Sequence, residues 1–378
     1  MSHALPKKMS RPPFRADQVG SLLRPDELTT ARQQWKRGTL DAVALRQIED
    51  RAVRDAVQRQ EAIGLQAVTD GEFRRDWWHL DFLGQLDGVT LTQNSGHKFR
   101  FAGQSEQPPI ASVTGRVGCS QPIMVADFAF LKSITTRLPK MTIPSPSMLH
   151  LRGGRAAISR QVYPDLDAFW DDVATAYRQA IAHLAAAGCR YLQLDDITFA
   201  YLCDPKIRQN CIANGDDPMA LPRRYAEVIN AALRDKPADM VVTIHTCRGN
   251  FKSAWVAEGG YDPVVEAMFS THVDGYFMEF DSARAGGFEP LRTLLSSGSD
   301  KRVVLGLVTT KLGELESADD LKRRIDEAAR IVPLERLCLS PQCGFSSTHH
   351  GNALSQDDQW RKLERVVQVA GEVWGEEG

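Results

Sequence analysis

The stretch Met240-Val-Val-Thr-Ile-His-Thr-Cys247 decides the predicted fold, because it is a short apolar run of β type that ends in polar side chains. Runs of this kind recur along the chain and alternate with longer amphipathic patterns. This alternation predicts parallel strands joined by helices, and eight such units favour a (β/α)8 TIM barrel. The predicted strands end near Val19, Thr69, Ile143, Leu194, Ile244, Met278, Leu307 and Ser340.

The amphipathic patterns between these runs predict the helices of the barrel. Several begin with a capping residue, such as Ser317 and Ser355, and Gly64 and Gly188 follow two predicted helix ends. A doubly wound sheet is less favoured, because no G-x-G-x-x-G sequence opens the first helix. The clearest helical patterns cover residues 40–63, 166–187, 218–234, 318–331 and 355–374.

One region breaks the alternation. Residues 77–120 are rich in Gly, Gln, Thr and Pro and contain short β-like pieces, which predicts a β-rich insertion after the second strand. We expect residues 15–378 to form a single barrel domain, and residues 1–14 to form a flexible N-terminal tail.

Composition limits the classes of function. The chain has 378 residues, of which 43% are hydrophobic, so it is long enough for a large core. Its 46 Lys and Arg residues nearly balance its 48 Asp and Glu residues, which gives no electrostatic reason to expect nucleic acid or a membrane surface as a partner. There is no signal peptide and no apolar run near the roughly 18 residues of a membrane span, so a cytoplasmic location is expected.

The seven cysteines do not suggest a disulfide framework. Their number is odd, the chain lacks a secretory signal, and no C-x-x-C pair occurs. Cys189 and Cys338 lie inside apolar runs and are expected to be core residues.

A metal site is predicted at the ends of three strands. On an extended segment, residues i and i+2 point to the same side, so His245 and Cys247 can face one ion. Imidazole and thiolate together suit zinc. A lone His-x-Cys pair also occurs in ordinary cores, so the prediction depends on two further ligand types at later strand ends, Glu279 and Cys343.

Nearly every predicted strand ends in a side chain that can bind a ligand or take part in catalysis. In a barrel the loops after the strands build the active site, so these groups are expected to meet at one end. Glu72 and Asp195 are interpreted as functional, whereas Asp196 is equally well explained as a helix cap. The remaining strand-end segments are Gly20-Ser21, Pro144-Ser-Pro-Ser147 and Thr309-Thr-Lys311.

The ordered set resembles the catalytic barrel of cobalamin-independent methionine synthase, in its short, single-barrel bacterial form. The likeness runs from about Phe14 to Trp374, almost the whole chain. The motifs that carry it are Val19-Gly-Ser21, Asp70-Gly-Glu-Phe73, Gln193-Leu-Asp195, His245-x-Cys247, Glu279 and Pro341-x-Cys-Gly344.

The resemblance implies a zinc-dependent 5-methyltetrahydropteroyltriglutamate-homocysteine S-methyltransferase, which forms methionine. It implies that zinc is held by His245, Cys247, Glu279 and Cys343. By the same likeness, Gly20 and Ser21 would lie near the carboxylate of homocysteine, and Glu72 and Asp195 would receive its ammonium group. The methylated folate is expected over the 144–147 segment, near Ser145, with Trp77 or Trp78 as stacking surfaces.

One segment departs from the family pattern. Longer members have Asp-x-His-Ser after strand seven, and that histidine is thought to help protonate the leaving folate nitrogen. Here the segment reads Gly306-Leu-Val-Thr-Thr-Lys311, so Lys311 is the candidate to replace the acid or to order a water that does.

Three alternatives stay open. Methylcobalamin is a second candidate donor, because its leaving group needs no proton. An epoxyalkane:coenzyme M transferase is a related zinc thiol alkyltransferase, although Glu72 and Asp195 favour an ammonium-bearing acceptor. A noncatalytic barrel with structural zinc is the third, but such sites usually use close C-x-x-C pairs. Self-association into a homo-oligomer, and whether His79, Trp77 and Trp78 line the pocket or only cover it, are left open.

Overall fold

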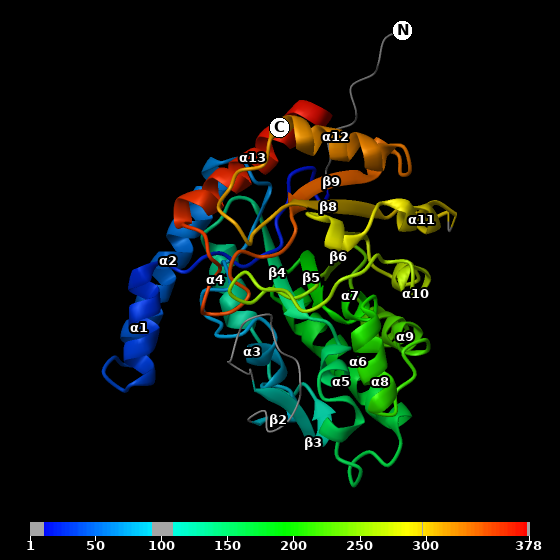
Figure 1. Cartoon of the computed structure of the whole chain (residues 1–378). Coiled ribbons are helices and arrows are strands. Elements are labelled where there is room, and N and C mark those ends of the chain that lie inside the picture. The colour runs from blue at the N-terminus through cyan, green and yellow to red at the C-terminus, as the bar shows by residue number, and fades with distance from the viewer. Residues whose placement is uncertain (1–10, 93–108, 297, 376–378) are drawn as a thin grey trace.

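A curved parallel sheet forms the centre of the molecule in the computed structural model, which describes residues 11–92, 109–296 and 298–375 (Figure 1). Its order is β1-β4-β5-β6-β7-β8-β9, and each neighbouring pair is parallel. The predicted alternation of helices and parallel strands is therefore confirmed. The strands are β1 (Ala67–Val68), β4 (Leu138–Pro144), β5 (Tyr191–Asp196), β6 (Val241–Thr246), β7 (Gly275–Glu279), β8 (Arg302–Val308) and β9 (Leu337–Pro341).

Helices lie around this sheet (Figure 1), and strands β5, β6, β7 and β9 are buried along their whole length. Buried residues such as Leu192, Ile244 and Leu305 belong to the main apolar core between the sheet and the helices. The helices are α1 (Asp26–Lys36), α2 (Ala42–Ala62), α3 (Leu80–Leu83), α4 (Val125–Ser133), α5 (Met148–Leu151), α6 (Leu166–Ala186), α7 (Thr198–Tyr201), α8 (Pro205–Ala213), α9 (Leu221–Leu233), α10 (Val265–Phe269), α11 (Arg292–Ser296), α12 (Ala318–Ala329) and α13 (Gln356–Trp374), with short 3-10 turns η1 (Gly154–Ala157), η2 (Ala283–Ala285), η3 (Glu289–Leu291) and η4 (Leu334–Arg336).

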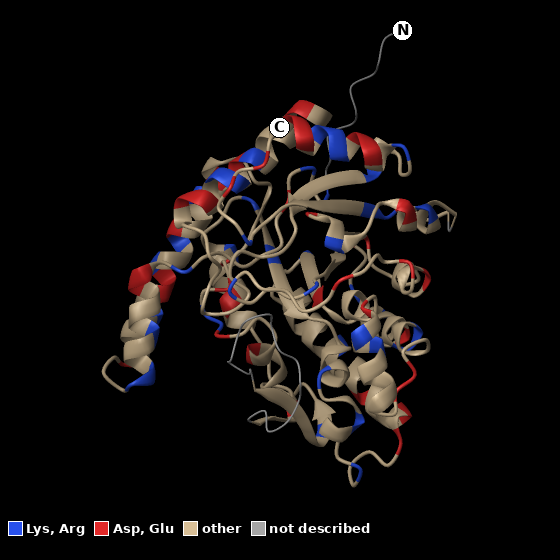
Figure 2. Cartoon of the chain, in the orientation of Figure 1, with Lys and Arg blue, Asp and Glu red and all other residues tan. Residues whose placement is uncertain are grey.

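Local sequence explains where these helices begin. The side chains of Asp41, Asp165, Ser317 and Ser355 each accept a hydrogen bond from a backbone N–H in the first turn of α2, α6, α12 and α13. Charges of both signs are mixed along the outer helices, whereas the strands are mostly uncharged (Figure 2). None of the described helices is long and apolar enough to cross a membrane.

The first predicted strand, ending at Val19, contributes one parallel bridge, from Ala16 to Leu339 of β9. The Asp17 N–H donates to Leu339 of β9 at 3.0 Å, whereas the Asp17 side chain occupies N–H groups on the opposite edge of this segment. The Asp17 carboxylate accepts hydrogen bonds from the backbone N–H groups of Phe14 (3.1 Å) and Gln18 (2.8 Å). Such local side-chain bonds compete with a strand ladder, so this segment follows the sheet edge with only one bridge.

Between β1 and β4 the chain forms a separate two-stranded antiparallel sheet. It consists of β2 (Asp87–Thr92) and β3 (Ile110–Gly118). These strands lie within the predicted β-rich region 77–120, of which residues 93–108 fall outside the described part. Most of the predicted tail 1–14 also falls outside it, because the description begins at residue 11.

A buried ion pair lies inside the curve of the sheet. Lys140 of β4 is 1% exposed, and its Nζ lies 3.2 Å from Oδ1 of Asp17. Tyr191 of β5 donates its hydroxyl to Oδ2 of the same carboxylate at 2.8 Å. The Lys140 ammonium also lies 4.0 Å from the ring centre of Phe277. The N-terminal segment is therefore fixed to β4 by the ion pair and to β5 by a hydrogen bond, while Phe277 of β7 stabilises the Lys140 ammonium.

Candidate metal and substrate site

Two strand ends bring one histidine and two cysteines together. His245 and Cys247 follow the i, i+2 spacing at the end of β6, and Cys343 follows β9. The Sγ atoms of Cys247 and Cys343 lie 3.3 Å apart, and one ligand atom from each of the three residues lies within 4.8 Å of the others. All three side chains are buried. An imidazole and two sulfurs at this spacing form a donor set that fits zinc.

The two sulfurs are hydrogen-bonded to each other, and this contact shifts their pKa values in opposite directions. Hydrogen bonding from Cys247 holds the pKa of the Cys343 thiol well below its usual value, although burial opposes this. The same hydrogen bond, with burial, raises the pKa of Cys247 well above its usual value. Cys343 is therefore the readier thiolate, and metals bind the thiolate form.

Glu279, the fourth predicted ligand, lies at the end of β7 and is fully buried, but it is not one of the three grouped ligands. Its carboxylate forms an ion pair with Arg284 and accepts the backbone N–H of Arg248 at 3.0 Å. Lys311 Nζ lies 3.9 Å from the same carboxylate. Burial raises the pKa of Glu279, but Lys311, Arg284 and Arg248 outweigh burial and lower it, so Glu279 is ionised.

Glu72 reaches the pocket through an unusual backbone turn. Gly71 and Glu72 after β1 both have positive φ, 67° and 59°, a conformation that is costly for a residue with a Cβ. Asp70 stabilises the turn by accepting the Glu72 N–H at 2.9 Å. The Glu72 carboxylate accepts the hydroxyl of Thr142 at 2.8 Å and lies 3.6 Å from the guanidinium of Arg75. Strain of this kind is often found at functional sites.

Asp195, at the end of β5, is the second buried carboxylate of the pocket. It accepts a hydrogen bond from Gln193 at 2.7 Å. Burial, and then repulsion by Glu72, raise the pKa of Asp195 to about 7. Burial also raises the pKa of Glu72, even though Arg75 opposes this. Two acids that disfavour each other's charge in this way would be stabilised by a cation placed between them.

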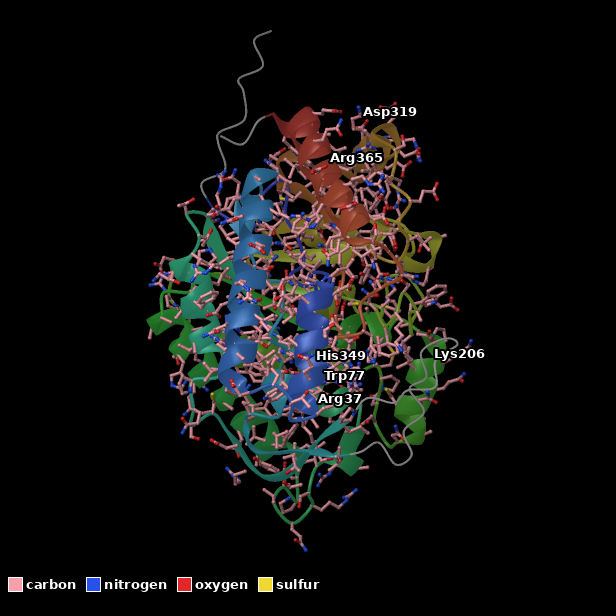
Figure 3. The ribbon with its side chains drawn as sticks, turned by 90° about the vertical axis from the view of Figure 1, so that its left-hand side faces the viewer. Arg37, Trp77, Lys206, Asp319, His349 and Arg365 are labelled. Carbon is pink, nitrogen blue, oxygen red and sulfur yellow. The ribbon has the colours of Figure 1, made fainter. Side chains whose placement is uncertain are left out.

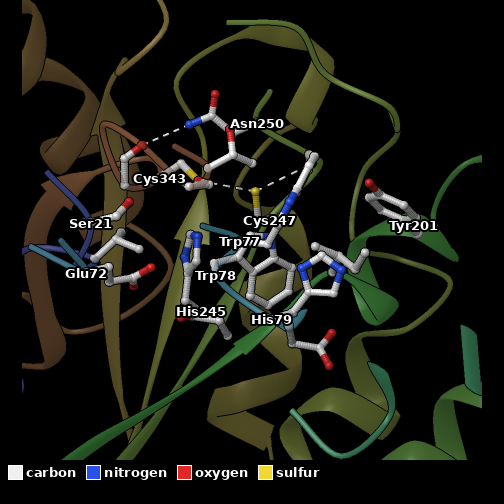
Figure 4. Close-up of a pocket in the computed structure, with 18 of the residues that line it drawn as sticks. Ser21, Glu72, Trp77, Trp78, His79, Tyr201, His245, Cys247, Asn250 and Cys343 are labelled. Carbon is white, nitrogen blue, oxygen red and sulfur yellow. Dashed lines mark hydrogen bonds between the residues drawn. The ribbon is translucent and has the colours of Figure 1, made fainter. Parts of the chain in front are cut away.

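These groups line one cavity, and Figure 4 shows Ser21 and Glu72 on one side of His245 and the cysteines, with His79 and Tyr201 on the other. Of the predicted residues, Ser21, Glu72, Trp77, Asp195, His245, Cys247 and Cys343 line it. Trp78 and His79 line it too, which answers a point the sequence left open. The other lining residues are Val19, Arg152, Asp196, Ile197, Tyr201, Gly249, Asn250, Gly344, Ser347 and Thr348.

Gly20, Ser145, Glu279 and Lys311 were also predicted at the site but are not among the lining residues. Gly20 directly precedes Ser21, which does line the cavity. The Ser21 side chain packs closely against Gly344, because a Cβ added at Gly344 would lie 1.9 Å from the Ser21 Oγ. Ser145 donates its hydroxyl to Asp196, which also accepts hydrogen bonds from Ser147 and from the backbone of Phe199. Asp196 therefore holds the first turn of α7 through the Phe199 N–H, and it lines the cavity as well.

Two loops are joined above the cavity. Trp77 forms an antiparallel bridge with Thr348, and the Trp78 N–H donates to the Ser347 carbonyl at 3.1 Å. The rings of Trp77 and His349 meet edge to face at 6.0 Å, and both residues are labelled in Figure 3. Trp77 is thus held by neighbours on the roof of the cavity, where its indole is partly buried.

Arg152 is the lining residue that sequence analysis missed most clearly. It is the one Lys or Arg among the described residues of the cavity wall, and its Nε has no hydrogen-bond partner among them. It follows α5, well past the end of β4, so no strand-end pattern marks it. Asn250, Ser347 and Thr348 were missed for a similar reason, since each lies in a loop beyond the predicted ligand.

The chain was compared with known protein families and with individual proteins. Residues 14–372 match the family model described as "Cobalamin-independent synthase, Catalytic domain". The chain is 49% identical over 368 residues to the uncharacterized protein YxjG of Bacillus subtilis (strain 168), covering 96% of each, and 45% identical over 371 residues to YxjH of the same organism, covering 97% of each.

Solved structures agree with these matches. A putative vitamin-B12 independent methionine synthase from Listeria monocytogenes has 39% identity and a TM-score of 0.76, and the match covers 96% of this chain and 99% of that one. A B12-independent methionine synthase from Shewanella sp. W3-18-1, in complex with selenomethionine, shares the fold at 20% identity with a TM-score of 0.71, over 95% of this chain and 97% of that one.

Proposed function

The chain belongs to the cobalamin-independent methionine synthase family, and from this premise we propose that it transfers a methyl group from 5-methyltetrahydrofolate, or its polyglutamate, to the thiol of homocysteine. The observation that carries the proposal is one cavity that joins a His-Cys-Cys set to two buried carboxylates. A thiol, an ammonium group and a carboxylate are the polar groups of homocysteine, and the cavity offers a partner for each.

We propose that His245, Cys247 and Cys343 hold zinc, with Glu279 completing the set if it exchanges its ion pair with Arg284. When bound, zinc would lower the pKa of the homocysteine thiol and keep its sulfur nucleophilic at neutral pH. Two thiolates and one carboxylate carry three negative charges, so this ligand set would leave electron density on a bound sulfur.

The two carboxylates would orient the amino acid. Glu72 and Asp195 would receive the ammonium group, which relieves the repulsion between them. Ser21, and the backbone N–H groups that follow Gly20, would receive the substrate carboxylate. An acceptor with a sulfonate and no ammonium would leave both acids unpaired, which disfavours coenzyme M as the thiol.

The methyl donor would enter from the side of Trp77 and Trp78, whose indoles offer stacking surfaces for a pterin ring. Ser145 would support this wall indirectly through its bond to Asp196. Lys311 is buried, and its Nζ lies 3.9 Å from Glu279. We propose that its charge influences the proposed metal ligands from this position.

We also propose that the fold is a complete eight-fold barrel in which the segment ending at Val19 takes the position between β9 and β1. A hydrogen bond from the Leu22 N–H to the Gly71 carbonyl (3.0 Å) supports this, because it links the segment to the loop after β1. In this proposal residues 15–378 form one domain, with residues 77–120 as an insertion over its mouth.

The decisive test is methyl transfer by zinc-loaded protein. Homocysteine should be offered with methyltetrahydrofolate mono- and polyglutamates, with methylcobalamin, and, in parallel, coenzyme M with an epoxide. Methionine formed from a folate supports the proposal. Methionine formed only from methylcobalamin would replace the donor, and a thioether formed only from coenzyme M would replace the acceptor as well.

A further inference from the structure

His79 is a buried histidine that has no role in the function proposed above. It is 2% exposed, it lines the cavity, and neither ring nitrogen has a hydrogen-bond partner among the residues that the structure describes. Its ring lies 4.6 Å from that of Trp78, on the proposed donor side of the cavity (Figure 4). An orphaned polar group in a cavity wall usually has a partner in a bound ligand or water.

Five other proton-carrying groups in or near the cavity wall are committed or unsuitable. Glu72 and Asp195 are needed for the ammonium group in the proposed function. Asp196 already accepts bonds from Ser147 and from the backbone of Phe199. Burial raises the pKa of the Tyr201 hydroxyl, which makes it a weaker acid than usual. Lys311 does not line the cavity.

The surroundings of His79 keep its ring uncharged. Burial, and then the guanidinium of Arg152, lower the pKa of His79 well below its ordinary value. A neutral imidazole has one N–H and one bare nitrogen. It can donate a proton from one nitrogen while it accepts another on the second nitrogen, so that its charge is the same before and after.

We propose that His79 relays a proton from a water molecule to the leaving nitrogen of the methyl donor, replacing the histidine that the loop after β8 lacks. This rests on the proposed function. The thiolate sulfur supplies the electron pair of the new S–C bond, and the pair of the broken C–N bond stays on nitrogen. That nitrogen takes the proton of one His79 nitrogen, the other ring nitrogen takes a proton from water, and hydroxide is left.

The first test compares His79→Ala with His272→Ala, whose histidine is exposed at the turn before β7 and serves as the matched control. With methyltetrahydrofolate, His79→Ala should lose about 10²–10⁴ in rate, the usual contribution of a proton-transfer group. Methyl iodide is a second donor whose iodide leaves without a proton, so the loss with it should be much smaller. Equal losses with both donors would overturn the relay.

The second test is chemical rescue of His79→Ala. Imidazole should restore folate turnover, because it carries both an N–H and a bare nitrogen. 1-Methylimidazole has no N–H when neutral, so it should fill the space without restoring the rate. Equal rescue by the two compounds would overturn the relay, because it would show that His79 only fills space.

The outcomes also separate the relay from the proposed function. If the unmodified protein uses the folate and His79→Ala keeps that activity, the relay alone is wrong. If the unmodified protein methylates homocysteine with methyl iodide but with no folate, the folate donor and the relay are both wrong. Zinc content and circular dichroism of each variant report whether it has folded.

Discussion

Asp195 and His245 are register partners on the neighbouring parallel strands β5 and β6. The carboxylate proposed for the substrate ammonium therefore lies beside the first ligand of the metal set. Both positions point into the same cavity, since both residues line it. The short separation between amine and thiol in homocysteine suits such a site, where two adjacent strand ends carry the two partners.

This relationship predicts that Asp195→Asn weakens homocysteine binding far more than zinc binding. A hydrogen bond to a charged group is worth about 1.5–3 kcal/mol, or roughly 10- to 150-fold in affinity. Isothermal titration with homocysteine, together with zinc analysis, measures both effects. Asp196→Asn is the contrast, and it should mainly lower the melting temperature, because Asp196 binds Ser147 and the start of α7. Unchanged homocysteine affinity in Asp195→Asn would remove this residue from the amino-acid site.

The zinc proposal predicts that Cys247→Ala or Cys343→Ala abolishes zinc binding and methyl transfer but leaves the far-ultraviolet circular dichroism nearly unchanged. Cys247 and Cys343 belong to the large apolar core, but each is one small side chain near the carboxyl end of a strand, so we expect the fold to survive its loss. Metal analysis after dialysis measures the loss.

Cys338→Ala is the matched control for these variants, because Cys338 is a fully buried cysteine inside β9. It should lower stability and keep the zinc. If the metal-free protein unfolds instead, zinc has a structural role and the catalytic interpretation is wrong.

The strand ends could be predicted because apolar runs fix both the strands and the face that their last residues share. His245 and Cys247 at i and i+2 are the clearest case. The first strand could not be predicted correctly in detail, because Asp17 and Lys140, far apart in sequence, meet inside the curve of the sheet and bind the backbone N–H and carbonyl of Gln18.

Other site residues were missed, or were predicted at the site but lie outside the cavity wall, for a different reason. The positive φ values of Gly71 and Glu72 decide where the Glu72 carboxylate points, and an apolar pattern does not encode them. Arg152 and His79 enter the cavity from loops and short helices, whose direction depends on tertiary packing. Glu279 was placed at the right strand end, but its three cationic neighbours become visible only in three dimensions.

The buried ion pair predicts a large loss of stability on single substitution. Lys140→Met or Asp17→Asn should each cost about 3–5 kcal/mol, because each leaves an uncompensated charge or unpaired polar groups in the core. The double variant should cost much less than the sum of the two. Urea unfolding of the unmodified protein, the two single variants and the double variant measures these changes in the free energy of unfolding. Additive losses would show that the two residues do not depend on each other.

Lys311 gives the sharpest contrast with His79. Its Nζ is buried 3.9 Å from Glu279 and away from the cavity wall, so its charge reaches the leaving group only indirectly. We therefore expect Lys311→Ala to lower methyl transfer by a similar factor with methyltetrahydrofolate and with methyl iodide, whereas His79→Ala should affect mainly the folate reaction. Parallel rate measurements with both donors decide between them. A loss confined to the folate in Lys311→Ala would assign the proton to this lysine, as the sequence alone suggested, and would leave His79 as part of the cavity wall.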